Sequence, residues 1–323
     1  MVRVFLIIGL FLSCCASCSS GYTIPSKAFG TDPTQIATFT EASSPAPTMT
    51  ALMNSHTPPT PQPSVSATET DEDAMEKNLP ATGILTITIV YDNNVFDPRL
   101  KAAWGFSALV EYRGHTLLFD TGGDGGLLIE NMSILGIDPT QIESVVLSHA
   151  HDDHTAGLGA LLDQGARPVV YLLPTFPDTY KNRLANRTEA IEVTPGLSIA
   201  EDLYTTGEMG KSTPEQALVV RTDRGLVVIT GCAHPGIIEI LEQARVLFNE
   251  PVHLVLGGFH LGGKSKVEVE EILRDFRHLS VERVAPCHCT GDQAIALFAA
   301  EYQGDFIQSG VGRVINLGTT SPK

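Results

Sequence analysis

Clusters of basic residues, evenly spaced cysteines and long apolar runs are all missing from this sequence. The 323 residues hold 21 Lys and Arg against 37 Asp and Glu, which gives a formal charge of −16. A surface of that sign repels phosphate backbones, so no nucleic-acid partner is expected. The six cysteines form two groups, within residues 14–18 and 232–289, and this spacing is not that of a disulfide framework.

The apolar run at the start of the sequence is too short to span a membrane. Residues 2–12 contain one arginine followed by mostly apolar residues, and small residues with Cys14, Cys15 and Cys18 come next. This is the layout of a secretory signal peptide. The cysteines also resemble a bacterial lipoprotein processing site, but the residue three places before Cys18 is not the usual Leu, so simple secretion stays open. We predict a signal peptide over residues 1–18 and an extracytoplasmic protein, either secreted or lipid-anchored to the bacterial cell envelope.

A stretch rich in Ser, Thr and Pro follows this leader. Residues 19–80 contain few apolar side chains that could be buried, so ordering them would cost more free energy than packing returns. We predict an extended tether here. The globular domain is predicted over residues 81–323. It would contact a membrane only through an N-terminal lipid anchor.

Strand-like and helix-like patterns occur in two sets beyond residue 81. Predicted strands are 84–91, 106–112, 115–119, 144–148, 169–173, 217–221, 226–229, 252–256 and 283–285. Predicted helices are 127–135, 157–162, 237–248, 267–278 and 293–302. Two sets of strands with helices between them favour an α/β fold in which two sheets pack together with helices outside. Two intervening loops, 171–187 and 203–215, are expected to line a substrate pocket.

A metal-binding pattern follows the predicted strand 144–148. His149 and His151 flank one alanine, so in extended chain both side chains share a face and can bind one metal ion. Asp153 and His154 come where the chain turns into a helix, and they can hold a second metal ion nearby. The strand–loop–helix context is the one that this arrangement requires.

These residues, with two further motifs, resemble the metallo-β-lactamase superfamily. Leu-Phe-Asp-Thr-Gly at residues 118–122 is similar to its first motif, and Pro-Cys-His at 286–288 is similar to its last. The resemblance implies an αβ/βα four-layer sandwich of two mixed sheets, with a dinuclear metal site at one edge. It also implies that Asp120 supports the site without binding metal and that His288 is a ligand.

Four phrases resemble a narrower branch of that superfamily. They are Trp-Gly-Phe-Ser at 104–107, Thr-Gly-Cys-Ala-His at 230–234, Gly-Gly-Phe-His-Leu at 257–261 and His-Cys-Thr-Gly at 288–291. Together they are similar to the group that contains dihydropterin-methyl-aminobenzene ribofuranosyl phosphate synthases. Most members of that group carry only a generic hydrolase description.

The sequence departs from the wider superfamily at two ligands. These are the third histidine of the first metal site and the acid that bridges the two metals. No histidine lies between His154 and His234, and Cys232 stands where the family has an acid after a strand. We predict that His234 completes a metal site with His149 and His151. Cys232 is either a thiolate ligand or a neighbour of the site, and a thiolate would favour zinc over magnesium or calcium.

Three other residues near the motifs have less certain roles. His260 follows two glycines at the end of a strand, and it is either a proton donor and substrate contact or a structural histidine. Cys287 and Cys289 flank His288. In extended chain they would point away from the face of His288, so we predict that both are packed in the interior.

The function expected from these features is that of a metal-dependent hydrolase. Two divalent ions, zinc by default but with iron or manganese fitting the same ligands, would activate water for attack on a small ester, lactone or phosphoester. Asp153 would hold a metal and orient the nucleophile, and either His260 or a metal-bound water would protonate the leaving group. Two alternatives remain: a pterin-related synthase or transferase on the same fold, and a non-catalytic metal-dependent sensing domain.

Overall fold

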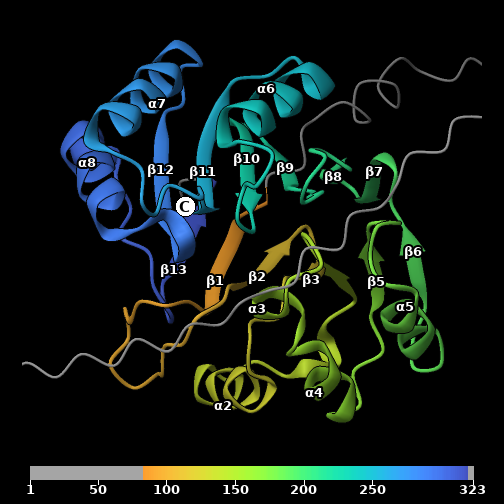
Figure 1. Ribbon diagram of the computed structural model, residues 1–323. Coiled ribbons are helices and arrows are strands. Elements are labelled where there is room, and N and C mark those ends of the chain that lie inside the picture. The colour runs from red at the N-terminus through yellow and green to blue at the C-terminus, as the bar shows by residue number, and fades with distance from the viewer. Residues whose placement is uncertain (1–82, 319–323) are drawn as a thin grey trace, which may run out of the picture. The chain divides into compact units, whose positions relative to one another are not determined.

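The computed structural model describes residues 83–318, which form two β-sheets covered by helices (Figure 1). The predicted signal peptide (1–18) and tether (19–80) lie outside the described residues. Within residues 83–318, no helix is both long enough and apolar enough to span a bilayer.

The first sheet has seven strands in the order β13-β1-β2-β3-β4-β5-β6. Pairing is antiparallel from β13 to β3 and parallel from β3 to β6, so the sheet is mixed. The strands are β1 (Leu85–Tyr91), β2 (Ser107–Tyr112), β3 (His115–Phe119), β4 (Ser144–Val146), β5 (Val169–Leu172), β6 (Ala190–Glu192) and β13 (Val314–Leu317).

The second sheet has six strands in the order β12-β11-β10-β9-β8-β7. It mirrors the first sheet, because β12, β11 and β10 are parallel and the remaining pairs are antiparallel. The strands are β7 (Pro195–Ala200), β8 (Leu203–Gly207), β9 (Leu218–Thr222), β10 (Gly225–Thr230), β11 (Val252–Gly258) and β12 (Arg283–Cys287).

Residues 83–318 contain seven α-helices, and the longer ones cover the outer faces of the two sheets (Figure 1). On the first sheet these are α2 (Gly125–Leu135), α3 (Asp152–Thr155), α4 (Leu158–Asp163) and α5 (Asp178–Ala185). On the second sheet they are α6 (Ile237–Phe248), α7 (Lys266–His278) and α8 (Asp292–Tyr302). Short 3₁₀ turns occur at Pro139–Gln141, His288–Thr290 and Gln303–Asp305.

Alternate side chains in the strands of the second sheet point to its two faces, and this explains why the sheet is covered on both sides. In β10, Val227 and Ile229 belong to the apolar core between the sheets, whereas Leu226 and Val228 belong to the core under α6, α7 and α8. Successive side chains on a strand point to opposite faces, so an apolar residue at every position requires cover on both faces. The result is a helix–sheet–sheet–helix sandwich, and the predicted α/β fold class is confirmed.

Some elements were not predicted from the sequence, and two loop assignments were wrong. The stretches 171–187 and 203–215 were expected to be loops, but they contain helix α5 and strand β8 respectively. Helix α5 is mostly polar and buries only Leu184, so its apolar periodicity is weak. Strands β6 and β7 are largely exposed edge segments, which lack the alternation that identifies a half-buried strand.

Two glycines near α4 allow a direct test of packing in this layer. A methyl group at Gly157 would overlap the carbonyl oxygen of Thr121, whereas one at Gly159 would meet nothing within 4 Å. We therefore expect Gly157→Ala to lower the free energy of unfolding by about 1–3 kcal/mol. Gly159→Ala lies in the same helix region and should raise it by up to about 1 kcal/mol. Urea unfolding of both variants measures the difference, and equal stabilities would contradict this packing.

Candidate metal centre

The polar residues of the candidate site follow the ends of five strands. Asp120 follows β3, and the segment 149–154 follows β4 in the first sheet; Cys232 and His234, His260 and His288 follow β10, β11 and β12 in the second. All five strands belong to the parallel parts of their sheets. The carboxyl ends of parallel strands meet at one edge, so residues from both sheets converge there.

Five of the histidines lie in close contact at this edge. The ring centroid of His149 is 4.5 Å from that of His151, 4.3 Å from that of His154 and 4.7 Å from that of His234. The His288 ring lies 4.9 Å from that of His154. His149 and His154 are fully buried, and His151 is exposed. The structure therefore brings together the histidines that the sequence assigned to one site.

Asp120 orients two histidines of the first sheet, His154 directly and His149 through Ser148. Its Oδ1 accepts the Ser148 backbone N–H at 2.7 Å, and its Oδ2 accepts both the Ser148 hydroxyl and His154 Nδ1 at 2.7 Å. Because the Ser148 hydroxyl donates to Asp120, its oxygen accepts from His149 Nδ1 at 2.9 Å. Burial would lower the pKa of His154, but Asp120 outweighs it and raises that pKa to about 8. When either ring is neutral, these contacts hold its proton on Nδ1 and leave the Nε2 lone pair available to a ligand.

His288 is held in the same way by a residue that sequence analysis missed. Its Nδ1 lies 3.1 Å from Oδ1 of Asn93, and the Asn93 amide donates to the His288 carbonyl oxygen at 3.1 Å. The Nε2 of His288 then faces Asp153, whose Oδ2 is 3.4 Å away. Asn93 lies in a loop 195 residues before His288, so no local pattern connects the two.

The loop that carries Cys232 and His234 is organised by Glu215, which was also missed. One carboxylate oxygen of Glu215 accepts the backbone N–H groups of Gly231, Cys232 and Ala233 at 2.9–3.1 Å. The other accepts the N–H of His234 at 2.9 Å. Glu215 is fully buried, and burial raises the pKa of its carboxyl above the usual range. A carboxylate on four successive amides sets the backbone path of the whole loop.

Cys232 lies at the centre of the site, and Cys289 is buried as predicted but does not point away from the site. The Sγ of Cys232 is 3.3 Å from His154 Nε2. Cys289 was expected to point away from the site, but residues 288–290 form a 3₁₀ turn and not a strand. The thiol of Cys289 therefore reaches the Cys232 carbonyl oxygen at 3.6 Å. Cys287 is buried, as the sequence suggested.

Left-handed backbone conformations are concentrated at this site. Among the non-glycine residues that the structure describes, Asp120, Ala233, His260 and His288 have φ values of 55°, 61°, 53° and 49°. A non-glycine residue at positive φ carries a conformational cost and persists only where surrounding contacts determine it. The backbone around the site is thus held in place by hydrogen bonds such as those of Glu215 and Asn93.

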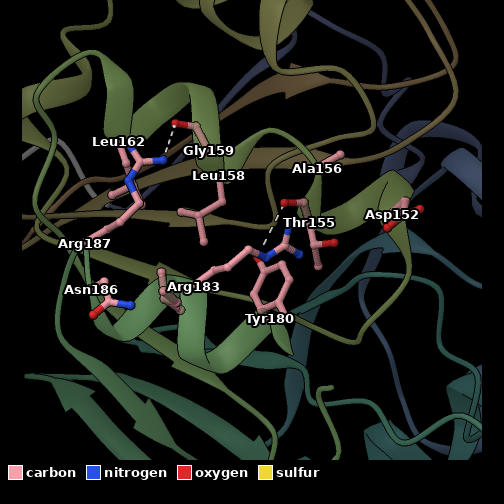
Figure 2. A pocket seen from close by; sticks show the side chains of 11 residues that line it. Asp152, Thr155, Ala156, Leu158, Gly159, Leu162, Tyr180, Arg183, Asn186 and Arg187 are labelled. Carbon is pink, nitrogen blue, oxygen red and sulfur yellow. Dashed lines mark hydrogen bonds between the residues drawn. The ribbon is translucent and has the colours of Figure 1, made fainter. Parts of the chain in front are cut away.

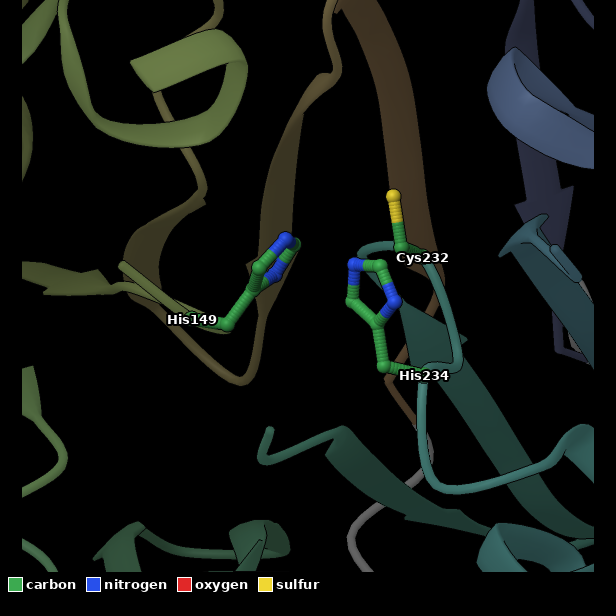
Figure 3. Close-up of side chains that lie close together, drawn as sticks. All are labelled: His149, Cys232 and His234. Atoms are coloured by element: carbon green, nitrogen blue, oxygen red, sulfur yellow. The ribbon is translucent and has the colours of Figure 1, made fainter. Parts of the chain in front are cut away.

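The donor atoms fit two metal ions, and two groups share one sulfur. His149, Cys232 and His234 have ligand atoms within 4.8 Å of one another, and so do His154, Cys232 and His288. Figure 3 shows His149 on one loop facing Cys232 and His234 on another. The Nε2 atoms of His234 and His288 are buried without a hydrogen-bond partner. Buried imidazole nitrogens are normally satisfied, so these two atoms fit metal ligands.

The charges in the site also suit metal binding. Burial lowers the pKa of His149, and burial together with the nearby His260 lowers the pKa of His234 to about 4. Both rings are therefore neutral at pH 7, as a ligand must be. Burial would raise the pKa of Asp153, but His288 and His154 outweigh it and hold that pKa well below its usual range.

Two cavities border the site. One of about 460 Å³ is lined by His234 and His260 themselves, with Phe259 and Lys264 among its other walls. The other, of about 530 Å³, lies between α3, α4 and α5, and Asp152 forms one end of it. Figure 2 shows Arg183 extending across this second cavity toward Tyr180 and Thr155. Since the first cavity contains two site imidazoles, it is the better candidate for the reacting part of a substrate.

Residues 105–288 match the sequence profile of the metallo-beta-lactamase superfamily. The chain belongs to this superfamily. The solved structure of a metal-dependent hydrolase of the beta-lactamase superfamily is 30% identical, covers 73% of this chain and 100% of its own, and superposes with a TM-score of 0.63. Both the family and the sandwich fold predicted from the sequence are confirmed.

Two further proteins are similar to this chain. A 7,8-dihydropterin-6-methyl-4-(beta-D-ribofuranosyl)-aminobenzene-5'-phosphate synthase from Methanocaldococcus jannaschii is 26% identical over 71% of this chain and 95% of its own. A metallo-beta-lactamase fold protein from Bacillus subtilis is 16% identical with a TM-score of 0.55, which shows the fold alone. Superfamily members bind divalent metals, and the His and Cys groups of this chain are suited to hold them.

Proposed function

We propose that this protein is a metal-dependent hydrolase that acts on a small ester, lactone or phosphoester. The observation that carries the proposal is the pair of three-residue groups that share Cys232. His149, His151 and His234 would hold one divalent ion and Asp153, His154 and His288 the other, with Cys232 between them. Zinc suits this mixture of imidazole and thiolate, while iron or manganese fits the imidazoles and the carboxylate. When bound, the ions would lower the pKa of a coordinated water and stabilise developing negative charge.

The chain's own residues supply orientation and proton transfer. The Asp153 carboxylate lies 3.4 Å from His288 and 3.6 Å from His154, where it can accept a hydrogen bond from the attacking water. His260 is exposed and lines the cavity beside His234. A hydrogen bond to Cys289 raises the pKa of His260, which favours a role for this ring in protonating a leaving group.

The cavity between α3 and α5 would hold the organic part of the substrate. Its walls combine apolar side chains, such as Leu158 and Leu184, with Arg183, for which no ion pair occurs within residues 83–318. Apolar walls with one convergent charge are typical of small-molecule sites. A compact organic anion fits these walls better than a nucleic acid does, given the net charge of −16.

A pterin-related synthase is the second candidate, because the M. jannaschii synthase is 26% identical over 95% of its length. A synthase of a pterin compound is expected to work where cofactors are made, inside the cell, whereas residues 1–18 of this chain have the pattern of a signal peptide. We propose that the mature domain works outside the cytoplasm, either secreted or held by a lipid anchor and the tether 19–80. This proposed location favours the hydrolase over the synthase.

Turnover assays on the zinc-loaded protein separate these candidates. We expect hydrolysis of a nitrophenyl phosphodiester, a lactone or a nitrophenyl ester, and its loss after chelation. His260→Ala should lower kcat by about 100-fold or more if the ring is the proton donor. His278→Ala removes another exposed imidazole at the end of α7 and should leave kcat unchanged.

The alternatives give different results in the same experiment. Zinc-loaded protein that hydrolyses none of the three substrates, but forms a carbon–carbon or carbon–nitrogen bond to a pterin, would replace the hydrolase with the synthase. Two bound metals without any turnover would indicate a sensing domain.

A further inference from the structure

We propose that Cys232 and Cys289 form a dithiol at the metal centre that small disulfides oxidise to an intramolecular disulfide, and that bound metal prevents this modification. The first part depends only on the positions of the two thiols. The second part rests on the proposed function, because it requires Cys232 to be a metal ligand.

The sheet order brings the two cysteines together. Cys232 lies two residues after the end of β10, Cys289 lies two residues after the end of β12, and β11 runs between these strands. The Sγ atoms lie within 4.8 Å of each other, and the Cys289 thiol donates to the Cys232 carbonyl oxygen at 3.6 Å. Both side chains are buried, at 4% and 9% exposure. The pair is therefore built into the second sheet and is not a chance meeting of surface loops.

A glycine at the end of β11 leaves the space between the two thiols open. A methyl group at Gly258 would lie 2.7 Å from Cys289 Sγ and 3.2 Å from Cys232 Cα. A side chain at this position would push the Cys289 thiol aside. Since a disulfide needs its sulfurs about 2 Å apart, rotations of the two side chains over this glycine are required.

The third cysteine of the described region does not compete for this bond. Cys287 is buried on the far side of the strand end, where its thiol contacts Asp92 and Ser309. His260, in contrast, has a ring nitrogen within 4.8 Å of both Cys232 and Cys289 sulfurs.

The chemical step is a thiol–disulfide exchange in two stages. One thiolate of the pair attacks a small disulfide such as oxidised glutathione, which forms a mixed disulfide and releases one small thiol. The second thiolate attacks the protein sulfur of that mixed disulfide and releases the other small thiol. Two protein thiols are oxidised by two electrons, one small disulfide is reduced to two thiols, and the two protons pass to those products.

The consequence for the metal centre follows from the position of Cys232. Its sulfur belongs both to the group with His149 and His234 and to the group with His154 and His288. A sulfur in a disulfide carries no negative charge and is a poor ligand, so oxidation would weaken both metal positions together. Conversely, a thiolate that binds metal is withdrawn from exchange.

Peptide mapping of the full-length protein tests the proposal. Metal-depleted and zinc-loaded samples are treated with oxidised glutathione, blocked with an alkylating reagent and digested with trypsin. Cys232 then lies in peptide 225–245, and Cys287 and Cys289 share peptide 284–313. Fragment ions between positions 287 and 289 identify the linked sulfur, and the N-terminal cysteines fall in other peptides.

We expect a Cys232–Cys289 link in the metal-depleted sample and at least tenfold slower formation in the zinc-loaded sample. In Cys289→Ser, the link should be replaced by a glutathione adduct on Cys232. Cys287 should remain unalkylated in both samples before denaturation, which verifies that the sheet is folded.

Separate glutathione adducts on Cys232 and Cys289, or a link through Cys287, would overturn the dithiol. Equal rates with and without zinc would overturn the protection by metal. Neither result depends on turnover, so each is distinguishable from failure of the hydrolase assays.

Discussion

Glu215→Ala is expected to lower the free energy of unfolding by about 3 kcal/mol or more, because it leaves four buried backbone N–H groups without an acceptor. The same change should weaken metal binding, since the released loop carries Cys232 and His234. Chemical unfolding and metal titration of the purified variant measure the two effects. Few single substitutions in this domain should lower the free energy of unfolding by more.

Two variants make the Glu215 result specific. Glu208→Ala removes an exposed carboxylate from the same region and should change the free energy of unfolding by no more than about 0.5 kcal/mol. Glu215→Gln keeps one oxygen acceptor but places an amide N–H against the loop's N–H groups, so its stability should fall between those of Glu215→Ala and the wild type. If Glu215→Ala and Glu208→Ala unfold at the same denaturant concentration, Glu215 does not organise the loop.

Cys232→Ser should reduce the affinity for both metal ions, whereas His234→Ala and His288→Ala should each reduce the affinity for one. The reason is that only the Cys232 sulfur belongs to both three-residue groups. Loss of a residue that merely orients a ligand costs about 10–100-fold in metal affinity, so loss of a shared ligand should cost at least as much. Metal content after dialysis against a graded chelator series gives both affinities.

Cys287→Ser is the matched control for this experiment. Cys287 is equally buried but belongs to neither group, so its serine variant should keep two metals per chain. If Cys232→Ser also keeps two metals at unchanged affinity, while His234→Ala loses one, then Cys232 is a neighbour of the site and the histidines alone carry the binding.

Local patterns predicted the parts of the fold that depend on local chemistry. The alternation of β1 and the fully apolar β10 are visible in the sequence because each side chain's burial is set by the strand's own period. The histidine motif was visible because its residues, 149–154, form one continuous segment after β4. Helix α5 and the edge strands β6 and β7 escaped prediction because exposure of most of their residues removes that period.

The supporting residues of the site could not be predicted in the same way. Asn93 hydrogen-bonds to a residue that is far away in sequence, and Glu215 hydrogen-bonds to a loop that follows an intervening hairpin. Asparagine and glutamate are common in loops, so neither position stands out without the fold. Cys289 was misplaced because a 3₁₀ turn at His288 changes the direction of its side chain, and His288 has the positive φ that marks the turn.

The position of β13 has a consequence for how the chain folds. Val314–Leu317 pairs with β1, and the hydrogen bond from Thr86 to Asn316 spans 230 residues. Contacts that far apart form slowly, because a long loop must close before they contribute any stability. A ribosome must therefore have completed nearly the whole domain before the first sheet can gain its edge strand. All residues of the metal centre are synthesised before this strand, and β13 itself contributes none of them.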